Sequence, residues 1–523
     1  MGIPSYFSYI IKNHKNIVKR LAGSQIPFQH LYMDCNSIIY DVIHKLEKNN
    51  VSINETEIFE NICNKIEEYI FMIKPSNTIF IAFDGVAPFA KMEQQRTRRY
   101  KNWYLNKILN KESSWNTSQI TPGTDFMNRL MERLKILFNL NKHKYNVPVF
   151  IFSGSQDHGE GEHKLFEHMR KNNSKNDNVI IYGLDSDLIM LSIFHRELFK
   201  NVYIFREAPE FIKSYVPIPI DSDSKLKTDE PYLMDIHYFM LSILDEMKCK
   251  DYDYHRIYDY VFLCFFLGND FLPHFPSLNI RTNGIMTLLT YYRNHIGSRR
   301  DCFLISREKN IQWNNLYIII QNICKNEHEL IMNEYFVRDK WDKRRWDEKI
   351  ELEEAILNLP IMDRSTEKYI NPNEPGWQSR YYKILFKDDY NKPDFINNLC
   401  RNYLEGLEWV FKYYYEGCPD WRWKYNYNYP PLFNNLVSFV PRKQFKLIKN
   451  NRKPFKNNTQ LAYVFSYESK ENIQKLLNNT NIKTINNSNS IDFQWAFCRY
   501  FWESHVDFPE ISIEKLIELD NVY

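Results

Sequence analysis

Residues 83–104 read FDGVAPFAKMEQQRTRRYKNWY, and the interpretation of the whole chain starts from this segment. Asp84 stands at the end of the apolar run 78–83, which has the length and composition of a buried strand. A Gly-Val-Ala-Pro turn leads into residues 89–104, which contain no helix breaker. If these residues are helical, one face carries Lys91, Gln95, Arg98 and Arg99. A buried strand followed by a solvated basic helix would give the same pattern, so this segment alone leaves both interpretations open.

Composition limits the class of protein. The 523 residues can bury one large core or two, and 44% hydrophobic with 25% charged residues is ordinary for a globular chain. The formal net charge is only +3, so any nucleic-acid site must come from local segregation of charge. The nine cysteines include no C-x-x-C pair, which excludes a zinc ribbon and gives no sign of a disulfide framework.

Targeting signals are missing from the sequence. The N-terminal residues lack a secretory pattern, and the longest apolar run, 261–267, is too short to cross a bilayer. We therefore expect an intracellular protein with reduced thiols and no membrane attachment, in the cytoplasm or the nucleus with the cytoplasm favoured. We also expect a monomer.

Apolar runs alternate with helical patterns in the first part of the chain. Strands are predicted at 30–33, 78–83, 147–152, 178–182 and 201–205. Helices are predicted at 5–21, 37–48, 55–73, 89–104, 125–138 and 162–170. This alternation indicates an α/β fold with a mainly parallel sheet and helices on both faces.

From Pro231 onward the pattern becomes helical. Helices are predicted near 258–267, within 316–358 and at 395–416. Loops are predicted at 362–376 and 441–458, and disorder in the Asn-rich stretch 477–490. We expect this largely helical second block to pack on the α/β core.

Acidic side chains follow the ends of the predicted strands, and one follows a predicted helix. The carboxyl ends of parallel strands share one edge of a sheet, so we expect these groups to converge. Convergent carboxylates repel one another unless cations are bound, and an all-oxygen ligand set favours Mg²⁺, with Mn²⁺ able to substitute. Two such ions would suit in-line hydrolysis of a phosphodiester. The candidate catalytic and metal-binding residues are Asp34, Asp84, Glu160, Glu162, Asp185, Asp187 and Asp270.

Each acidic motif taken alone has an ordinary explanation. Most D-x-D motifs are solvated turns, and an E-x-E before a helix usually complements the helix dipole. Several of them at successive strand ends of one sheet favour a metal-dependent phosphoryl-transfer enzyme. The basic helix fits this interpretation, because the forked donors of Arg98 and Arg99, with Lys91 and Gln95, would bind a terminal phosphate beside the metals.

Ten longer segments resemble the XRN-type 5′→3′ exoribonuclease family, in the order of that family and over nearly the whole chain. They are MGIPSYFSYI, LYMDCNSIIY, FDGVAPFAKMEQQRTRRY, TPGTDFM, GEGEHK, YGLDSDLIML, FLGNDFLPHFP, EPGWQSRYYK, GLEWVFKYYYEGCPDWRWKYNYNYPP and FCRYFWESHVDFP. The resemblance implies a PIN/flap-nuclease-like core and Mg²⁺-dependent, two-metal hydrolysis of single-stranded RNA from a 5′ monophosphate, releasing mononucleotides. It also implies that the seven acids are the metal site and that Lys91, Gln95, Arg98 and Arg99 bind the 5′ monophosphate, while capped and triphosphorylated ends are excluded.

Two departures from the family pattern affect these expectations. Tyr40 stands where the family usually has a His that stacks on the 5′ base, and a Tyr can still stack. Its stacking partner would be Trp421 or Trp423, with core packing as the alternative for both. The chain also stops soon after Phe508, where the large cytoplasmic family member continues, so a minimal form of the enzyme is expected.

The resemblance also suggests a division of the chain. We predict a nuclease core at 1–305 with the acidic site and the 5′-phosphate pocket, and a helical connecting segment at 306–394. A second block at 395–523 is predicted to wall the site, and its basic segment 442–456 either holds RNA backbone or is a solvated loop. The alternative functions are a flap-type DNA 5′ nuclease and a catalytically inactive RNA-binding protein. No residue distinguishes RNA from DNA on physical grounds.

Overall fold

The structure is a computed structural model, and it describes most of the chain. The described residues are 2–14, 17–21, 24–49, 54–111, 115–207, 231–343, 346, 350–468, 474 and 491–523. The predicted disorder at 477–490 lies outside them. Within this part of the chain, no helix combines the length and the apolar character needed to cross a membrane.

A seven-stranded sheet lies at the centre of the first part of the chain, with strand order β1-β7-β6-β5-β2-β3-β4. The five strands from β6 to β4 run parallel, which confirms the predicted α/β fold with a mainly parallel sheet. Two antiparallel strands, β7 and β1, extend one edge. The strands are β1 Val18–Arg20, β2 His30–Asp34, β3 Thr78–Ala82, β4 Val149–Ser153, β5 Ser174–Tyr182, β6 Phe199–Glu207 and β7 Pro231–Asp235.

The two antiparallel strands correct two predictions. Residues 5–21 do not form one helix, because helix α1 ends at Asn13 and residues 18–20 pair with β7. The chain is also not helical directly from Pro231, where β7 begins. Both strands are short and find their partners far away in the sequence, so neither segment carries a strand signal of its own.

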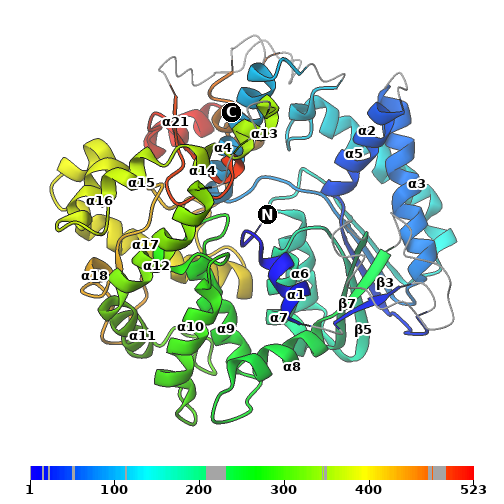
Figure 1. The fold of residues 1–523 in the computed structure, drawn as a ribbon. Helices are drawn as coiled ribbons and strands as arrows, with labels where there is room; N and C mark the ends of the chain where they lie inside the picture. Colours follow the sequence, from blue (N-terminus) through cyan, green and yellow to red (C-terminus); the bar gives the residue numbers. More distant parts are fainter. Residues whose placement is uncertain are drawn as a thin grey trace.

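Helices cover both faces of the sheet, and the side chains of the parallel strands alternate between these two layers. Leu31 and Met33 of β2 lie in the core on one face, whereas Tyr32 between them lies in the core on the other. The first face is covered by α2 Asn36–Lys48, α3 Glu55–Ile73 and α5 Asp125–Asn141. The second is covered by α1 Tyr6–Asn13, α6 Gly161–Lys171, α7 Asp187–His195 and α8 Ile236–Met247 (Figure 1).

The later part of the chain is mainly helical, as predicted. Its helices are α9 Arg256–Cys264, α10 Gly284–Tyr292, α11 Trp313–Lys325, α12 Glu327–Asp342, α13 Leu352–Leu357, α14 Leu359–Met362, α15 Ser365–Ile370, α16 Trp377–Phe386, α17 Phe395–Tyr415, α18 Phe433–Leu436, α19 Asn457–Val464 and α21 Ile513–Val522. Two short strands, β8 Asp492–Gln494 and β9 His505–Asp507, pair with each other. The predicted loop 362–376 is wrong in part, because it contains α15.

The helical part shares a core with the sheet. Phe194 of α7 packs edge-on against Phe411 of α17, with ring centroids 5.7 Å apart, and both belong to one continuous apolar cluster. This cluster crosses residues 305 and 394, and the division of the chain at those two positions stays a prediction.

Helix α4, Phe89–Ile108, follows β3 and connects the sheet to the end of the chain. Phe89 and Met92 at its start pack against α19 and α21 in a separate apolar cluster. The backbone N–H of Phe89 also donates to the carbonyl of Trp421, 2.8 Å away. These contacts hold α4 at the carboxyl edge of the sheet (Figure 1).

Candidate active site

Asp34 and Asp84 lie at the ends of neighbouring parallel strands. Asp34 is the last residue of β2, and Asp84 follows β3 by two residues. Asn36 at the start of α2 holds Asp84 from both sides, because its amide donates to the carboxylate and accepts the Asp84 backbone N–H at 3.1 Å. The N–H of Gly161 donates to the other Asp84 oxygen at 2.7 Å. Asp84 is therefore oriented before any ligand binds.

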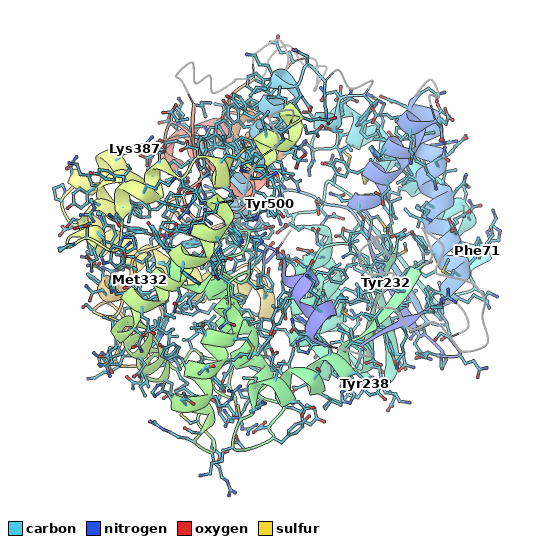
Figure 2. The ribbon with its side chains drawn as sticks, in the orientation of Figure 1. Phe71, Tyr232, Tyr238, Met332, Lys387 and Tyr500 are labelled. Atoms are coloured by element: carbon cyan, nitrogen blue, oxygen red, sulfur yellow. The ribbon has the colours of Figure 1, made fainter. Side chains whose placement is uncertain are left out.

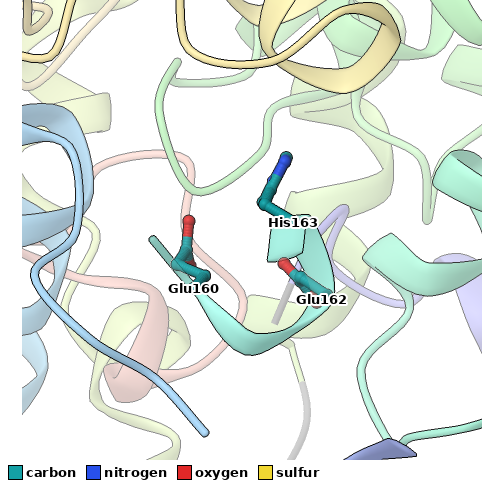
Figure 3. Close-up of side chains that lie close together, drawn as sticks. All are labelled: Glu160, Glu162 and His163. Carbon is teal, nitrogen blue, oxygen red and sulfur yellow. The ribbon is translucent and has the colours of Figure 1, made fainter. Parts of the chain in front are cut away.

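Glu160 and Glu162 flank the first residue of α6. Both side chains are buried, and their carboxylate oxygens lie within 4.8 Å of each other and of a ring nitrogen of His163 (Figure 3). Tyr413 of α17 donates to Glu160 at 2.6 Å, and its ring lies flat against His163 at a centroid distance of 3.7 Å. The helical part of the chain thus contacts the acids directly.

Lys91 joins the acids of the sheet to Asp270. Its ammonium group lies 2.6 Å from Glu160 and 2.8 Å from Asp270, and all three side chains are almost fully buried. Asp185 follows β5 and is exposed, whereas Asp187 is buried in the first turn of α7. Tyr414 of α17 hydrogen-bonds to Asp187.

Burial and neighbouring charges shift the pKa values of several of these acids. Burial is the largest cause that raises the pKa of Asp34, Glu162 and Asp187, and neighbouring carboxylates raise each further. Burial and Asp84 also raise the pKa of Glu160, against the opposing effect of Lys91. For Asp270, burial is opposed by Lys91, which lowers the pKa below its usual range. The structure therefore brings the seven predicted acids together, and their mutual repulsion is only partly relieved by Lys91.

These residues fit divalent metal ions. Oδ1 of Asp34 is shielded from solvent and has no hydrogen-bond partner in the described part of the chain. Position 161 must be glycine here, because a Cβ atom would lie 2.5 Å from that oxygen. This carboxylate oxygen receives no hydrogen bond and lies among other carboxylates. Carboxylate oxygens are the ligands that Mg²⁺ prefers. Asp34, Asp84, Glu160, Glu162, Asp185, Asp187 and Asp270 could hold such ions.

Two of the predicted phosphate-binding residues lie beside the acids, and a third lies beside Tyr40. Lys91 contacts the acids, and Arg98 faces the same side, where its charge acts on Asp185 and Asp270. Arg99 instead donates to the carbonyl of Ile120 at 2.8 Å and hydrogen-bonds to Tyr40. Gln95 is buried, and its side-chain oxygen has no partner among the described residues. Polar side chains of α4 therefore extend from the acids to Tyr40, and at least one of them has a polar atom without a partner among the described residues.

The two candidate tryptophans differ in their surroundings. Trp423 is buried, with 6% exposure, and stacks on Trp409 at a centroid distance of 5.2 Å. Trp421 is partly exposed and lies against the loop before α6, where its ring is 6.3 Å from that of His158. Core packing accounts for Trp423, so Trp421 is the one that can meet a ligand.

Sequence reasoning missed several residues that shape this site. Asn36 and Tyr413 bind acids, and Lys164 donates to the carbonyls of Phe83 at 2.7 Å and Gly154 at 2.8 Å. Lys164 thereby ties the ends of β3 and β4 to α6. Asn36 and Lys164 stand within two residues of predicted acids, which was the available signal. Tyr413 carried none, because its contact depends on the packing of α17.

Comparison with known proteins places the chain in a family. One family model, the XRN 5′-3′ exonuclease N-terminus, matches residues 1–208, and a second, the Xrn1 helical domain, matches residues 251–359 and 362–521. The chain belongs to the XRN 5′-3′ exonuclease family. The XRN resemblance expected from the sequence is thus confirmed, and the match includes both the acids and the helices that surround them.

Curated XRN-family relatives match nearly all of the chain. Human 5′-3′ exoribonuclease 1 is 28% identical over 90% of the chain and 31% of its own length. Saccharomyces cerevisiae 5′-3′ exoribonuclease 1 is 27% identical over 90% of the chain and 39% of its own length. For Candida albicans 5′-3′ exoribonuclease 2 the values are 25%, 89% and 66%. The chain therefore spans between about a third and two thirds of the length of these relatives.

Among solved structures, the catalytic core of Rad2 in complex with DNA substrate is similar to this chain with 14% identity and a TM-score of 0.33. The similarity covers 67% of this chain and 83% of that one.

Proposed function

We propose that this XRN-family chain is a Mg²⁺-dependent 5′→3′ exoribonuclease that degrades single-stranded RNA from a 5′ monophosphate to mononucleotides. The observation that carries the proposal is the convergence of seven carboxylates at one edge of the sheet, beside the polar face of α4. The names of the relatives, which are 5′-3′ exoribonucleases, support the same reaction.

The proposed reaction is hydrolysis of the first phosphodiester bond. Water attacks the phosphorus between the first and second nucleotides, and the bond from that phosphorus to the 3′ oxygen of the first nucleotide breaks. The products are a nucleoside 5′-monophosphate and an RNA shortened by one residue that again carries a 5′ monophosphate. When bound, two Mg²⁺ ions would activate the water and stabilise the leaving oxygen.

The residues of this chain hold the reacting groups in place. The seven acids would hold the metals, Asn36 fixes Asp84, and Tyr413 fixes Glu160. Arg98, Arg99 and Gln95 would bind the terminal phosphate, with Lys91 between it and the acids, because guanidinium groups bind phosphate oxygens in pairs. Tyr40 hydrogen-bonds to Arg99 and so stands where the first base would stack, with Trp421 as the partner for a later base. A monomeric state stays a prediction. A cytoplasmic location stays a prediction.

The decisive experiment compares RNA ends. Three RNAs of identical sequence carry a 5′ monophosphate, a 5′ triphosphate or a 5′ hydroxyl, and each is incubated with the protein and Mg²⁺. We expect rapid release of nucleoside monophosphates from the first RNA alone. Asp185→Ala should lower this rate by at least about 100-fold, because an acid that stabilises the transition state is lost. Arg98→Ala should mainly weaken the preference for the monophosphate, whereas Lys107→Ala at the far end of α4 should change neither.

Other results would favour the alternative functions. Equal decay of all three RNAs would exclude recognition of the 5′ end. Internal cleavage of a branched DNA duplex would favour a flap-type DNA nuclease. Binding of RNA without Mg²⁺-dependent cleavage would favour an inactive RNA-binding protein.

A further inference from the structure

A cavity of about 520 Å³ lies beside the acids on a second face of α4. Its lining residues include Asp270 of the acid site and Trp502, which is 40% exposed. The size falls within the range of about 300–1,000 Å³ that small-molecule sites occupy. The cavity therefore joins the acid site to the surface of the protein and is large enough for one nucleotide.

The cavity and the predicted phosphate site use different stripes of α4. The stripe that lines the cavity recurs at helical spacing: Ala90, Gln94, Thr97, Lys101 and Leu105. Arg99, next to Tyr40, lies on nearly the opposite side of the helix axis from Gln94 and Lys101. Arg98 lies between the two stripes and also lines the cavity. A phosphate bound by Arg98 is thus already at the rim of this cavity.

Four cations and three acids line the cavity, and one of these acids, Asp270, is paired with Lys91 at 2.8 Å. Lys424 pairs with Glu93 at 2.7 Å, and Arg281 pairs with Glu503 at 2.5 Å, so these four groups compensate one another. Lys101 is buried, and among the described residues it donates only to neutral carbonyls, those of Trp502 at 2.7 Å and Ser504 at 2.8 Å. Burial lowers its pKa to about 8, so it is still mainly charged at neutral pH.

Arg98 is the second cation without a compensating partner. In the described part of the chain, no ion pair joins its guanidinium group to a carboxylate, although Asp185 and Asp270 feel its charge. A buried ammonium group and an unpaired guanidinium group in one cavity favour an anionic ligand.

Unpartnered polar groups line the same cavity. Ser504 is 2% exposed, and its hydroxyl has no hydrogen-bond partner among the described residues. Both polar atoms of the Gln94 side chain are likewise shielded and unpartnered. Buried groups of this kind are expected to bind water or a ligand.

One residue that lines the cavity, Trp502, contacts a second aromatic ring outside the lining. Trp502 stacks on Tyr500 at a centroid distance of 5.8 Å, and the guanidinium group of Arg281 lies within 6 Å of both rings. Figure 2 shows Tyr500 in the middle of the molecule, between the sheet and the helices. Aromatic faces bind bases of any sequence by stacking. The cavity thus offers the cations Arg98 and Lys101 for a phosphate and the ring of Trp502 for a base.

We propose that this cavity binds the nucleoside 5′-monophosphate released by each cut and guides it out past Trp502, away from the incoming RNA. The proposal rests on the proposed function, since it takes its ligand from that reaction. A separate exit would let the shortened RNA advance to the acids from the Tyr40 side without waiting for the product to leave by the same path.

The test measures binding of a mononucleotide directly. Fluorescent N-methylanthraniloyl-AMP is titrated into the protein in the presence of EDTA, so that no cleavage is needed for the readout. Thr97→Trp fills the cavity and Trp502→Ala removes its outer ring, while Lys107→Trp places the same bulk on an exposed part of α4. We expect the first two variants to weaken binding by at least about ten-fold, and the control to leave it unchanged. The melting temperature of each variant shows whether it is folded.

Kinetics separate this proposal from the proposed function. With 5′-monophosphorylated RNA, the two cavity variants should make the first cut in a single turnover at nearly the wild-type rate, but should slow under multiple turnover and resist inhibition by added AMP. If folded variants bind AMP like the wild type, or lose the first cut as well, the exit cavity is wrong while the exonuclease stands. If the wild type binds AMP at this cavity but degrades no RNA, the nucleotide site stands and the exonuclease is wrong.

Discussion

At the scale of single residues, Gly161 lies in direct contact with two acids of the site, Asp84 and Asp34. Its N–H holds Asp84, and its Cα faces Asp34 so closely that a Cβ atom would lie 2.5 Å from Oδ1 and 3.5 Å from the carbonyl of Ala82. The glycine therefore serves the site by having no side chain, while its backbone supplies a hydrogen bond.

Replacement of this glycine should damage activity more than stability. In Gly161→Ala the new methyl group displaces Asp34, and we expect the rate of RNA cleavage to fall by at least about 100-fold. Gly154→Ala is the matched control, because its Cβ atom would meet only the side chain of Met131 at ordinary distances from 3.4 Å. Steady-state cleavage rates and melting temperatures check the pair. Equal activity of the two variants would show that Asp34 can move without loss.

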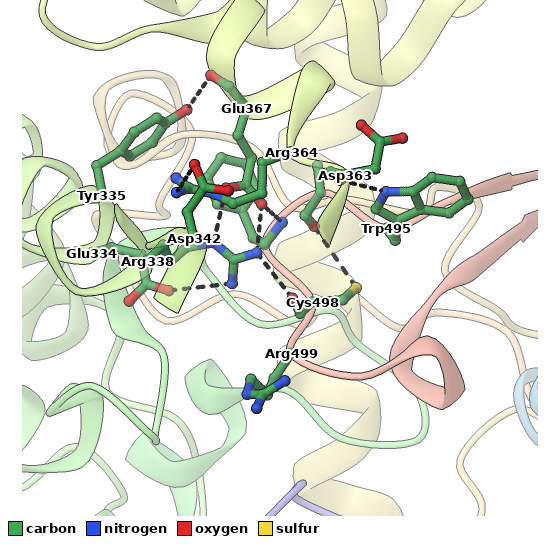
Figure 4. Close-up of polar contacts among 12 residues, drawn as sticks. Glu334, Tyr335, Arg338, Asp342, Asp363, Arg364, Glu367, Trp495, Cys498 and Arg499 are labelled. Atoms are coloured by element: carbon green, nitrogen blue, oxygen red, sulfur yellow. Dashed lines mark hydrogen bonds and ion pairs between the residues drawn. The ribbon is translucent and has the colours of Figure 1, made fainter. Parts of the chain in front are cut away.

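At the scale of elements, buried ion pairs join helices in the later part of the chain. Glu367 of α15 accepts from Arg338 of α12 at 2.6 and 2.9 Å and from Arg364 at 2.6 Å (Figure 4). It also accepts the N–H of Phe497 at 2.8 Å. One carboxylate thus connects two helices and a segment near the end of the chain.

Loss of this carboxylate should destabilise the protein strongly. Glu367→Ala removes the closest carboxylate from the buried Arg338, whose other acid partner Glu334 lies 3.9 Å away, and leaves Arg364 with Asp339. Removing one side of a buried ion pair costs about 3–5 kcal/mol of unfolding free energy. Glu353→Ala removes one side of an exposed pair with Lys111, for which we expect at most about 1 kcal/mol. Urea denaturation followed by circular dichroism measures both. A loss for Glu367→Ala no larger than for the control would mean that water replaces the ion pairs.

Elements with a long, regular pattern were predictable from the sequence, and those defined by distant partners were not. The helix predicted at 55–73 is α3 with the same bounds, since eight buried residues recur along it and Asn54 caps its start. The short helix α15 escaped prediction because its buried residues include Glu367, which looks like a surface residue in sequence. The acids were predictable because each follows a strand or a helix end. Tyr413 was not, because α17 is brought to Glu160 only by the tertiary fold.

At the scale of the whole molecule, α4 connects the sheet, the acid site and the last part of the chain. Besides Lys91 and Arg98, it carries Glu93, which pairs with Lys424 at 2.7 Å and accepts a hydrogen bond from Tyr463 of α19. Arg96 of the same helix donates to Ser466 at 2.9 Å. The position of the phosphate-binding face therefore depends on contacts made with residues more than 300 positions away in the sequence.

The Glu93 contacts should make stability depend on pH. Burial alone would raise the pKa of Glu93, but Lys424 and Arg96 lower it to about 2 from its usual 4.5. Because the folded pKa is the lower one, this carboxylate stabilises the fold above pH 4.5, and the stabilisation is lost as the pH falls towards 2. The loss amounts to at most about 3.5 kcal/mol, since one unit of pKa shift corresponds to about 1.4 kcal/mol. Glu93→Gln should have a lower unfolding free energy than wild type at pH 7, and this free energy should fall less between pH 5 and pH 2.5. Urea denaturation at each pH measures both.

Glu68→Gln, in an exposed pair with Lys65 on α3, should keep the wild-type pH profile. Parallel profiles for Glu93→Gln and wild type would show that other carboxylates set the acid sensitivity of the fold.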